Sequence, residues 1–154
     1  MQPHPEEHRM IDQLRRSRFR ATHQRLAVMQ VLMESRSHPS AEEIYQQLKR
    51  SHTTMSLATV YKTLQLLSSM GALLTIETGT GGQRFDGHLH PHHHAICNKC
   101  GRVFDIDFHK YPIDLEKKNF LANFQIQEIK VTFTGICHVC ETLKGKPTAP
   151  PASD

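Results

Sequence analysis

The sequence predicts an α+β protein, with an N-terminal winged helix-turn-helix domain followed by a C-terminal α/β domain that contains a four-cysteine zinc site. Three observations predict this fold class. Capping residues and apolar spacing indicate successive helices in the first half of the 154-residue chain. A glycine-rich turn between two short strand-like segments follows these helices. All four cysteines lie in the second half, as two Cys-x-x-Cys pairs.

Three main helices are expected before the glycine-rich turn, and each has a recognisable start. The first begins after the N-cap candidate Thr22. The second begins with a capping box formed by Ser40 and Glu43. The third begins after Ser56 and ends before Gly71, because glycine readily adopts the left-handed conformation that follows a helix. The apolar side chains expected on the buried faces of these helices are Leu26, Val28, Met29, Leu32, Ile44, Tyr45, Leu48, Leu57, Val60, Leu64 and Leu67.

A hairpin is expected after the third helix. Residues 73–77 and 83–85 have the composition of strands, and the turn between them, residues 78–82, contains three glycines. Helices followed by a glycine-tipped hairpin follow the order of the winged helix-turn-helix fold, in which the third helix enters the major groove of DNA. The alternative is a small helical domain whose polar helix face is only solvated.

The charge distribution agrees with a nucleic-acid-binding first half. Residues 1–84 carry 11 Lys and Arg against 7 Asp and Glu, whereas residues 85–154 carry 8 of each. This asymmetry suits a basic module joined to a neutral partner domain. An ordinary basic surface explains the charge equally well, so charge alone decides nothing.

The cysteine pairs predict one structural zinc ion bound by Cys97, Cys100, Cys137 and Cys140. The 36 residues between the pairs are enough for a helix and a strand, and four thiolates form a complete tetrahedral set. A thioredoxin-like redox site would need only one pair, and two disulfides would need an oxidising compartment. The N-terminus has no apolar leader segment, so a cytoplasmic location is expected. No run of about 20 apolar residues is present, so no membrane span is expected either.

The second half otherwise predicts a small mixed α/β unit. Residues 94–107 alternate as strands do, Pro112 can begin a helix, and apolar residues alternate over residues 129–133. A unit of this size has a thin core, so a zinc ion and a dimer partner would both stabilise it. Residues 6–18 suggest a short surface helix, and residues 145–154 are expected to form a disordered, proline-rich tail.

Six segments of the chain resemble the ferric uptake regulator (Fur) family of bacterial metal-dependent repressors. They occur in the family's order and span about residues 12–141. The matching segments are residues 20–25 (RATHQR), 38–45 (HPSAEEIY), 56–64 (SLATVYKTL), 84–86 (RFD), 92–101 (HHHAICNKCG) and 135–140 (GICHVC). The resemblance implies a winged-helix DNA-binding domain over residues 1–84, a hinge over 85–91 and a dimerisation and metal-binding domain over 92–144. It also implies a homodimer that binds a palindromic operator in double-stranded DNA when a regulatory divalent ion is present.

The resemblance also implies a regulatory metal site at the hinge. By position in the matched segments, its ligands are His38, Asp86, His92, His94 and Asp105. Such a set suits Fe(II) or Mn(II). His92 and His94 are two positions apart, so on a strand they point to the same side. The other histidines, His88, His90, His93, His109 and His138, are interpreted as solvated side chains.

Within the family, the peroxide-sensing (PerR) branch is the better match, because it typically has Asp where this chain has Asp86 and Asp105, while iron sensors often have Glu. In that branch bound Fe(II) reacts with hydrogen peroxide and the oxidant attacks a ligand, a role that the resemblance carries to His38 and His92. The alternative is an iron-responsive repressor that senses Fe(II) availability. The family's additional histidine-rich site is not expected, since Pro91 and Ile129 stand at two of its positions.

The expected DNA contacts follow from the role of the third helix. Thr59 and Tyr61 are assigned to the groove, and Lys62 and Arg25 to phosphates.

Two other classes of protein are alternatives to a repressor. A non-haem iron enzyme would need two histidines, a carboxylate and open coordination positions. A metal-storage protein would bind metal without binding DNA. The winged-helix pattern argues against both.

Overall fold

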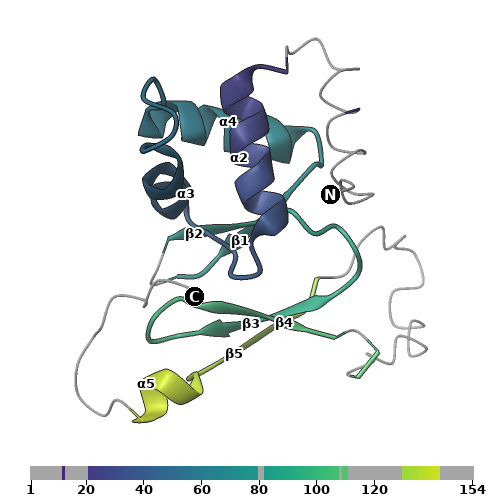
Figure 1. The fold of residues 1–154 in the computed structure, drawn as a ribbon. Helices are drawn as coiled ribbons and strands as arrows, with labels where there is room; N and C mark the ends of the chain where they lie inside the picture. The colour runs from purple at the N-terminus through teal and green to yellow at the C-terminus, as the bar shows by residue number, and fades with distance from the viewer. Residues whose placement is uncertain (1–11, 13–20, 80–81, 108, 111–129, 143–154) are drawn as a thin grey trace.

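Within the part of the N-terminal half that the structure describes, helices pack above a hairpin (Figure 1). The computed structural model describes residues 12, 21–79, 82–107, 109–110 and 130–142. The helices are α2 (His23–Glu34), α3 (Ala41–Leu48) and α4 (Leu57–Ser69). The hairpin consists of β1 (Leu74–Glu77) and β2 (Gln83–Asp86), which pair antiparallel with Thr75 opposite Phe85.

The predicted starts of all three helices are confirmed. The Thr22 hydroxyl accepts a hydrogen bond from the backbone N–H of Arg25, and the Ser56 hydroxyl accepts one from Thr59. Ser40 and Glu43 form the complete capping box at the start of α3. Each cap satisfies backbone donors that the helix itself leaves without a partner, so a short sequence signal is enough to fix the start.

The core of this half lies where the three helices meet and continues to the hairpin through Phe85. The expected apolar faces are confirmed, with differences in degree: Leu26 and Leu57 are only partly buried. Tyr45 was expected to be buried but is also only partly so, and the amino group of Lys49 lies 6.0 Å from its ring centroid. Within these expected faces, the residues with almost no exposed surface are Val28, Met29, Leu32, Ile44, Val60, Leu64 and Leu67.

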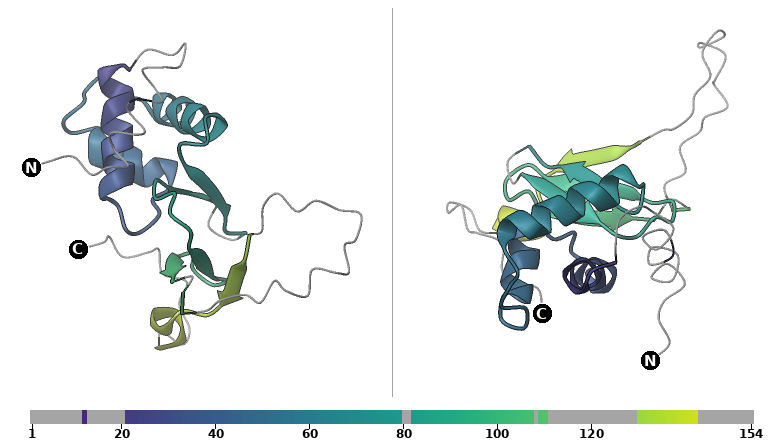
Figure 2. Two further views of the ribbon diagram at one scale, coloured as in Figure 1. Left: turned by 90° about the vertical axis from the view of Figure 1, so that its right-hand side faces the viewer. Right: turned by 90° about the horizontal axis from the view of Figure 1, so that it is seen from above.

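A second sheet forms the C-terminal half and lies beyond the hairpin from the helices (Figures 1 and 2). Its strands are β3 (His93–Cys97), β4 (Val103–Ile106) and β5 (Thr132–Gly135), in the order β4-β3-β5. β3 pairs antiparallel with β4 and parallel with β5. A short helix, α5 (His138–Thr142), follows β5. The central strand β3 therefore places His94 near one end of the sheet and Cys97 at the other.

Three predictions lie outside the described residues, apart from residue 12: the surface helix over residues 6–18, the helix beginning at Pro112, and the tail over 145–154. The strand expected over residues 129–133 is present as β5, but it begins at Thr132 and all four of its residues are exposed. In the described part of the chain, no helix has the length and apolar character required to cross a membrane.

Candidate metal centres and the DNA-facing helix

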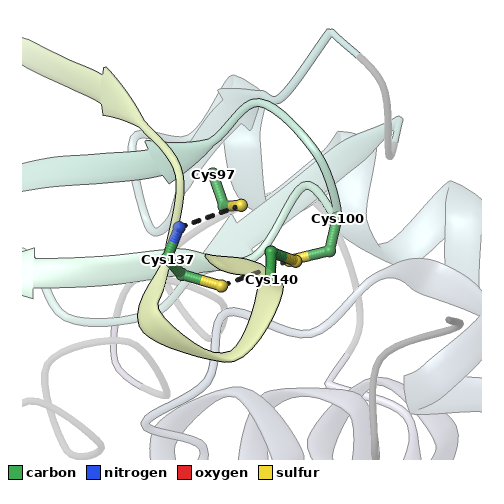
Figure 3. A group of neighbouring side chains, drawn as sticks. All are labelled: Cys97, Cys100, Cys137 and Cys140. Carbon is green, nitrogen blue, oxygen red and sulfur yellow. Dashed lines mark hydrogen bonds between the residues drawn. The ribbon is translucent and has the colours of Figure 1, made fainter. Parts of the chain in front are cut away.

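The four cysteines converge where β3 and β5 end. Cys97 is the last residue of β3, and Cys100 lies in the turn that follows. Cys137 directly precedes α5, and Cys140 lies within it. Their sulfur atoms all lie within 4.8 Å of one another, and Figure 3 shows them turned toward a common centre. All four thiols are free of disulfide bonds. The structure thus brings together every residue of the predicted zinc site.

The electrostatics of these thiols favour a bound cation. Burial alone would raise the pKa of Cys97, but backbone N–H groups of Cys137, Cys100 and Lys99 lower it to about 6 by donating to the sulfur. The Cys137 N–H lies 3.3 Å from that sulfur. For Cys140, burial and then the adjacent thiols raise the pKa to about 12. The Cys97 thiolate is therefore stabilised, whereas the Cys140 thiol beside it resists ionisation. A tetrahedral zinc ion would stabilise all four cysteines as thiolates.

A second cluster lies between the two halves of the molecule and contains all five predicted regulatory ligands. His38 precedes α3 and Asp86 ends β2, so both belong to the N-terminal half. His92 directly precedes β3, His94 lies within it, and Asp105 lies on β4 directly opposite His94. One ligand atom from each of His38, Asp86, His92 and His94 fits within 4.8 Å of the others.

The two carboxylates face the same three imidazoles. Oδ2 of Asp86 lies 3.0 Å from Nε2 of His92, 3.4 Å from Nε2 of His94 and 3.8 Å from Nε2 of His38. Oδ1 of Asp105 lies 2.9 Å from Nε2 of His38, 3.5 Å from that of His92 and 4.0 Å from that of His94. The Asp86 side chain is almost fully buried, whereas 41% of the Asp105 side chain is exposed. The cluster therefore faces solvent on the Asp105 side.

A hydrogen bond outside the cluster prepares His92 for a metal. Its Nδ1 lies 2.7 Å from the carbonyl oxygen of His90, which can only accept, so Nδ1 carries the proton. In the neutral ring Nε2 then has a free lone pair, and this atom lies 3.0 Å from Nε2 of His94. Two imidazole nitrogens that face each other beside two carboxylates form a donor set that a divalent cation would stabilise.

The carboxylates are held in the anionic form that a metal requires. Burial would raise the pKa of Asp86, but the hydrogen bond with His94, the backbone N–H of His88 and the neighbouring imidazoles together lower it. The His88 N–H lies 2.8 Å from Oδ1, so Oδ2 remains directed at the cluster. Burial would likewise raise the pKa of Asp105, and interactions with His38 and the other histidines lower it.

His38 has an unusual backbone conformation. Its φ of 50° lies in the left-handed region, which makes it the one non-glycine residue with positive φ among the described residues. His, Asn and Asp tolerate this region better than most side chains do. The turn buries His38, which is only 3% exposed, and directs it toward the carboxylates.

Three of the predicted DNA contacts, Thr59, Tyr61 and Lys62, lie on α4, and the fourth, Arg25, lies on α2. Lys62 and Tyr61 are exposed, while Thr59 and Arg25 are partly buried. The Tyr61 hydroxyl is 2.6 Å from Oε1 of Glu42, to which it donates, and the Thr59 hydroxyl is 2.8 Å from that of Ser56. The side-chain hydroxyl of Tyr61 is therefore already engaged in the free chain, and contact with an acceptor on DNA would require it to leave Glu42.

Sequence reasoning missed the contacts of the two adjacent glutamates of α3. Glu42 pairs with Tyr61, and Glu43, expected only to cap α3, also forms an ion pair with Arg84. The close contact between Gly87 and Leu32 was missed as well. A Cβ at position 87 would lie 3.3 Å from backbone atoms of Leu32. His93 was interpreted as solvated but is buried, with its ring centroid 6.1 Å from that of Phe133. The alternation of β3 could have indicated this, since His93 faces away from His92 and His94.

Comparison with known families decides what kind of protein has this architecture. A model of the ferric uptake regulator family matches residues 16–134, which is most of the chain. The chain belongs to the ferric uptake regulator family. It is accordingly a metal-dependent repressor of the Fur type, and not the enzyme or storage protein considered as alternatives.

Similar proteins include both peroxide and metal regulators. A peroxide-responsive repressor PerR from Staphylococcus epidermidis is 35% identical over 133 residues, which cover 85% of this chain and 87% of the relative. The Campylobacter jejuni peroxide stress regulator has a structure similar to this one, with a TM-score of 0.66, 26% identity and coverage of 90% of this chain and 100% of that one. The Helicobacter pylori ferric uptake regulator Fur has a TM-score of 0.76 and covers 91% of this chain and 94% of its own, but at 21% identity it supports only the fold.

Proposed function

We propose that this Fur-family protein represses transcription when Fe(II) or Mn(II) occupies the five-residue cluster, and that it responds to peroxide through oxidation of His38 or His92. The observation that carries the proposal is the convergence of His38 and Asp86 from the N-terminal half with His92, His94 and Asp105 from the sheet. These residues have the imidazole and carboxylate chemistry that suits Fe(II) and Mn(II), and the four cysteines suit Zn(II).

Coupling to DNA would arise from the position of the cluster between the two halves. Donors from both halves can bind one ion only at a particular relative orientation of the winged helix and the sheet. In a homodimer, that orientation sets the separation of the two α4 helices, which must match successive major grooves of a palindromic operator. Metal binding would thus select the conformation that binds double-stranded DNA.

The peroxide response would depend on the same side chains. Bound Fe(II) would supply redox chemistry by which hydrogen peroxide adds one oxygen atom to a ligand imidazole and leaves water as the other product. The His38 and His92 side chains are 2% and 4% exposed, so an oxidant formed at the cluster meets them before bulk solvent. An oxidised imidazole donates more weakly to a metal, and the two halves would then lose their fixed orientation. The PerR relative supports this branch of the family.

The test is anaerobic binding of operator DNA by the zinc-loaded protein with either Fe(II) or Mn(II), before and after one equivalent of hydrogen peroxide. We expect peroxide to abolish binding only in the Fe(II) form, with one added oxygen atom on the peptides that contain His38 or His92. Binding that follows iron, shows no added oxygen on either peptide after peroxide and recovers once ferrous iron is resupplied would instead identify an iron-responsive repressor.

Lys62 offers a separate test of the DNA-facing helix. Its exposed position on α4 suits contact with a phosphate rather than with a base edge. Replacing Lys62 with Ala should weaken binding to all DNA sequences alike and reduce the slope of log affinity against log salt by about 1 for each lysine replaced. Fluorescence anisotropy at several salt concentrations measures both effects, and Lys110→Ala, which removes an exposed lysine beyond β4, is the control. Weaker binding to the operator alone would contradict the phosphate role.

A further inference from the structure

The segment that leaves β2 is attached to the helices of the N-terminal half. The N–H of Phe85 donates to the carbonyl oxygen of Pro39 at 3.1 Å. Gly87 packs so closely on Leu32 that a Cβ would lie 3.3 Å from its backbone. Nε2 of His88 lies 3.3 Å from the carbonyl oxygen of Ser35. Through these contacts, residues 87 and 88 are attached to the N-terminal half, although β2 ends at Asp86.

The strongest of these attachments is the ion pair between Arg84 and Glu43. The Arg84 side chain is 9% exposed, and its Nη1 donates to Oε2 of Glu43. The same carboxylate oxygen accepts the backbone N–H of Ser40 at 2.8 Å. One carboxylate therefore joins the first turn of α3 to strand β2, which are 41 residues apart in the sequence.

The ion pair connects two segments that each contain one of the proposed metal donors of the N-terminal half. Ser40 is two residues after His38, and Arg84 is two residues before Asp86. The ion pair therefore closes a ring of contacts that contains both donors. His38 needs such support, because its left-handed backbone must be held by surrounding structure.

We propose that Arg84 and Glu43 are positioning residues that hold His38 and Asp86 as a preformed half of the regulatory site. The inference rests on the proposed function of the cluster. The ion would bind the preformed pair and then fix His92, His94 and Asp105 against it. Binding is tighter when part of the donor set is already in place, because less ordering is required.

The experiment measures Mn(II) binding to the full-length, zinc-loaded chain by electron paramagnetic resonance of the free ion. Glu43→Gln keeps an oxygen that can cap α3 but removes the charge that pairs with Arg84. Arg84→Lys keeps the charge but loses the rigid, planar guanidinium group. We expect each variant to bind Mn(II) on the order of tenfold more weakly, as replacement of residues that orient metal ligands usually does. Glu77→Gln is the matched control, because Glu77 is in the same hairpin and pairs with Gln83, not with α3.

The outcomes separate positioning from stability and from a failure of the proposed site. A purely structural ion pair would lower the unfolding temperature of the metal-free protein without changing the Mn(II) affinity of the folded chain, which would overturn the inference. If Glu77→Gln weakens Mn(II) binding as much as Glu43→Gln does, the inference is also overturned, because the loss would then be a general effect of charge. If the parent protein binds no Mn(II), or binds it equally well after His38→Ala, the proposed function itself fails.

Discussion

Replacing His38 with Ala is expected to remove metal-dependent binding to operator DNA. In the proposed site, His38 is one of two donors from the winged-helix half, so its removal leaves Asp86 alone to connect the ion to that half while the donors of the sheet stay in place. Binding of one ligand typically changes the affinity for a second ligand by up to about 100-fold. Here the two ligands are Mn(II) and operator DNA. At a Mn(II) concentration that saturates the parent, we expect the variant to lose most of the increase in DNA affinity that Mn(II) causes.

The backbone of His38 calls for a second variant. Alanine tolerates a φ of 50° less well than histidine, so His38→Ala could alter the turn as well as the site. Asn adopts this conformation readily, and His38→Asn therefore replaces the imidazole while preserving the turn. Operator binding titrated with Mn(II) measures both variants, with His109→Ala, an exposed histidine beyond β4, as the control. Full Mn(II)-dependent binding by His38→Asn would refute the assignment of His38 as a ligand.

Replacing Cys97 with Ser is expected to release zinc and unfold the C-terminal sheet. β3 and β5 are parallel neighbours joined at their ends by the cysteine cluster, where the N–H of Asn98 also donates to the carbonyl oxygen of Gly135 at 2.8 Å. Structural zinc sites in small domains contribute about 10–16 kcal/mol of apparent binding energy, comparable to or larger than the whole stability of many domains. Removing one thiolate should therefore take away most of the support for this pair of strands.

Zinc content by elemental mass spectrometry and thermal unfolding by circular dichroism test this expectation together. The control is His138→Ala, which changes an exposed side chain between the second pair of cysteines and leaves all four sulfurs intact. A Cys97→Ser protein that keeps one zinc per chain and the unfolding temperature of the parent would show that the cluster is not a structural zinc site.

The sequence predicted local features of this fold well and long-range side-chain contacts poorly. The starts of α2, α3 and α4 follow from Thr22, Ser40 and Ser56, whose partners lie three residues away, so the sequence contains the whole interaction. The pairing of Arg84 with Glu43 depends on how α3 packs against β2, and no local sequence pattern predicts it. The same is true of Tyr61 and Glu42, and of the parallel pairing of β3 with β5.

The two clusters were predicted for different reasons. The spacing of Cys97 and Cys100, repeated at Cys137 and Cys140, is itself a metal-binding pattern. The five donors of the second cluster are scattered from residue 38 to residue 105, and only resemblance to a family connected them. Spacing alone indicated just one pair, His92 and His94, and the structure shows why: the strand that follows His92 turns both rings to one side.

Strand β3 implies an order of assembly. His94 belongs to the regulatory cluster and Cys97 to the zinc cluster, and only two residues separate them on one short strand. Before zinc joins the ends of β3 and β5, the strand that presents His94 is paired with β4, but its parallel pairing with β5 lacks the cluster that connects the two strands. A newly made chain is therefore expected to acquire zinc first and to complete the proposed second metal site only afterwards, so zinc deprivation should weaken binding of the second metal as well.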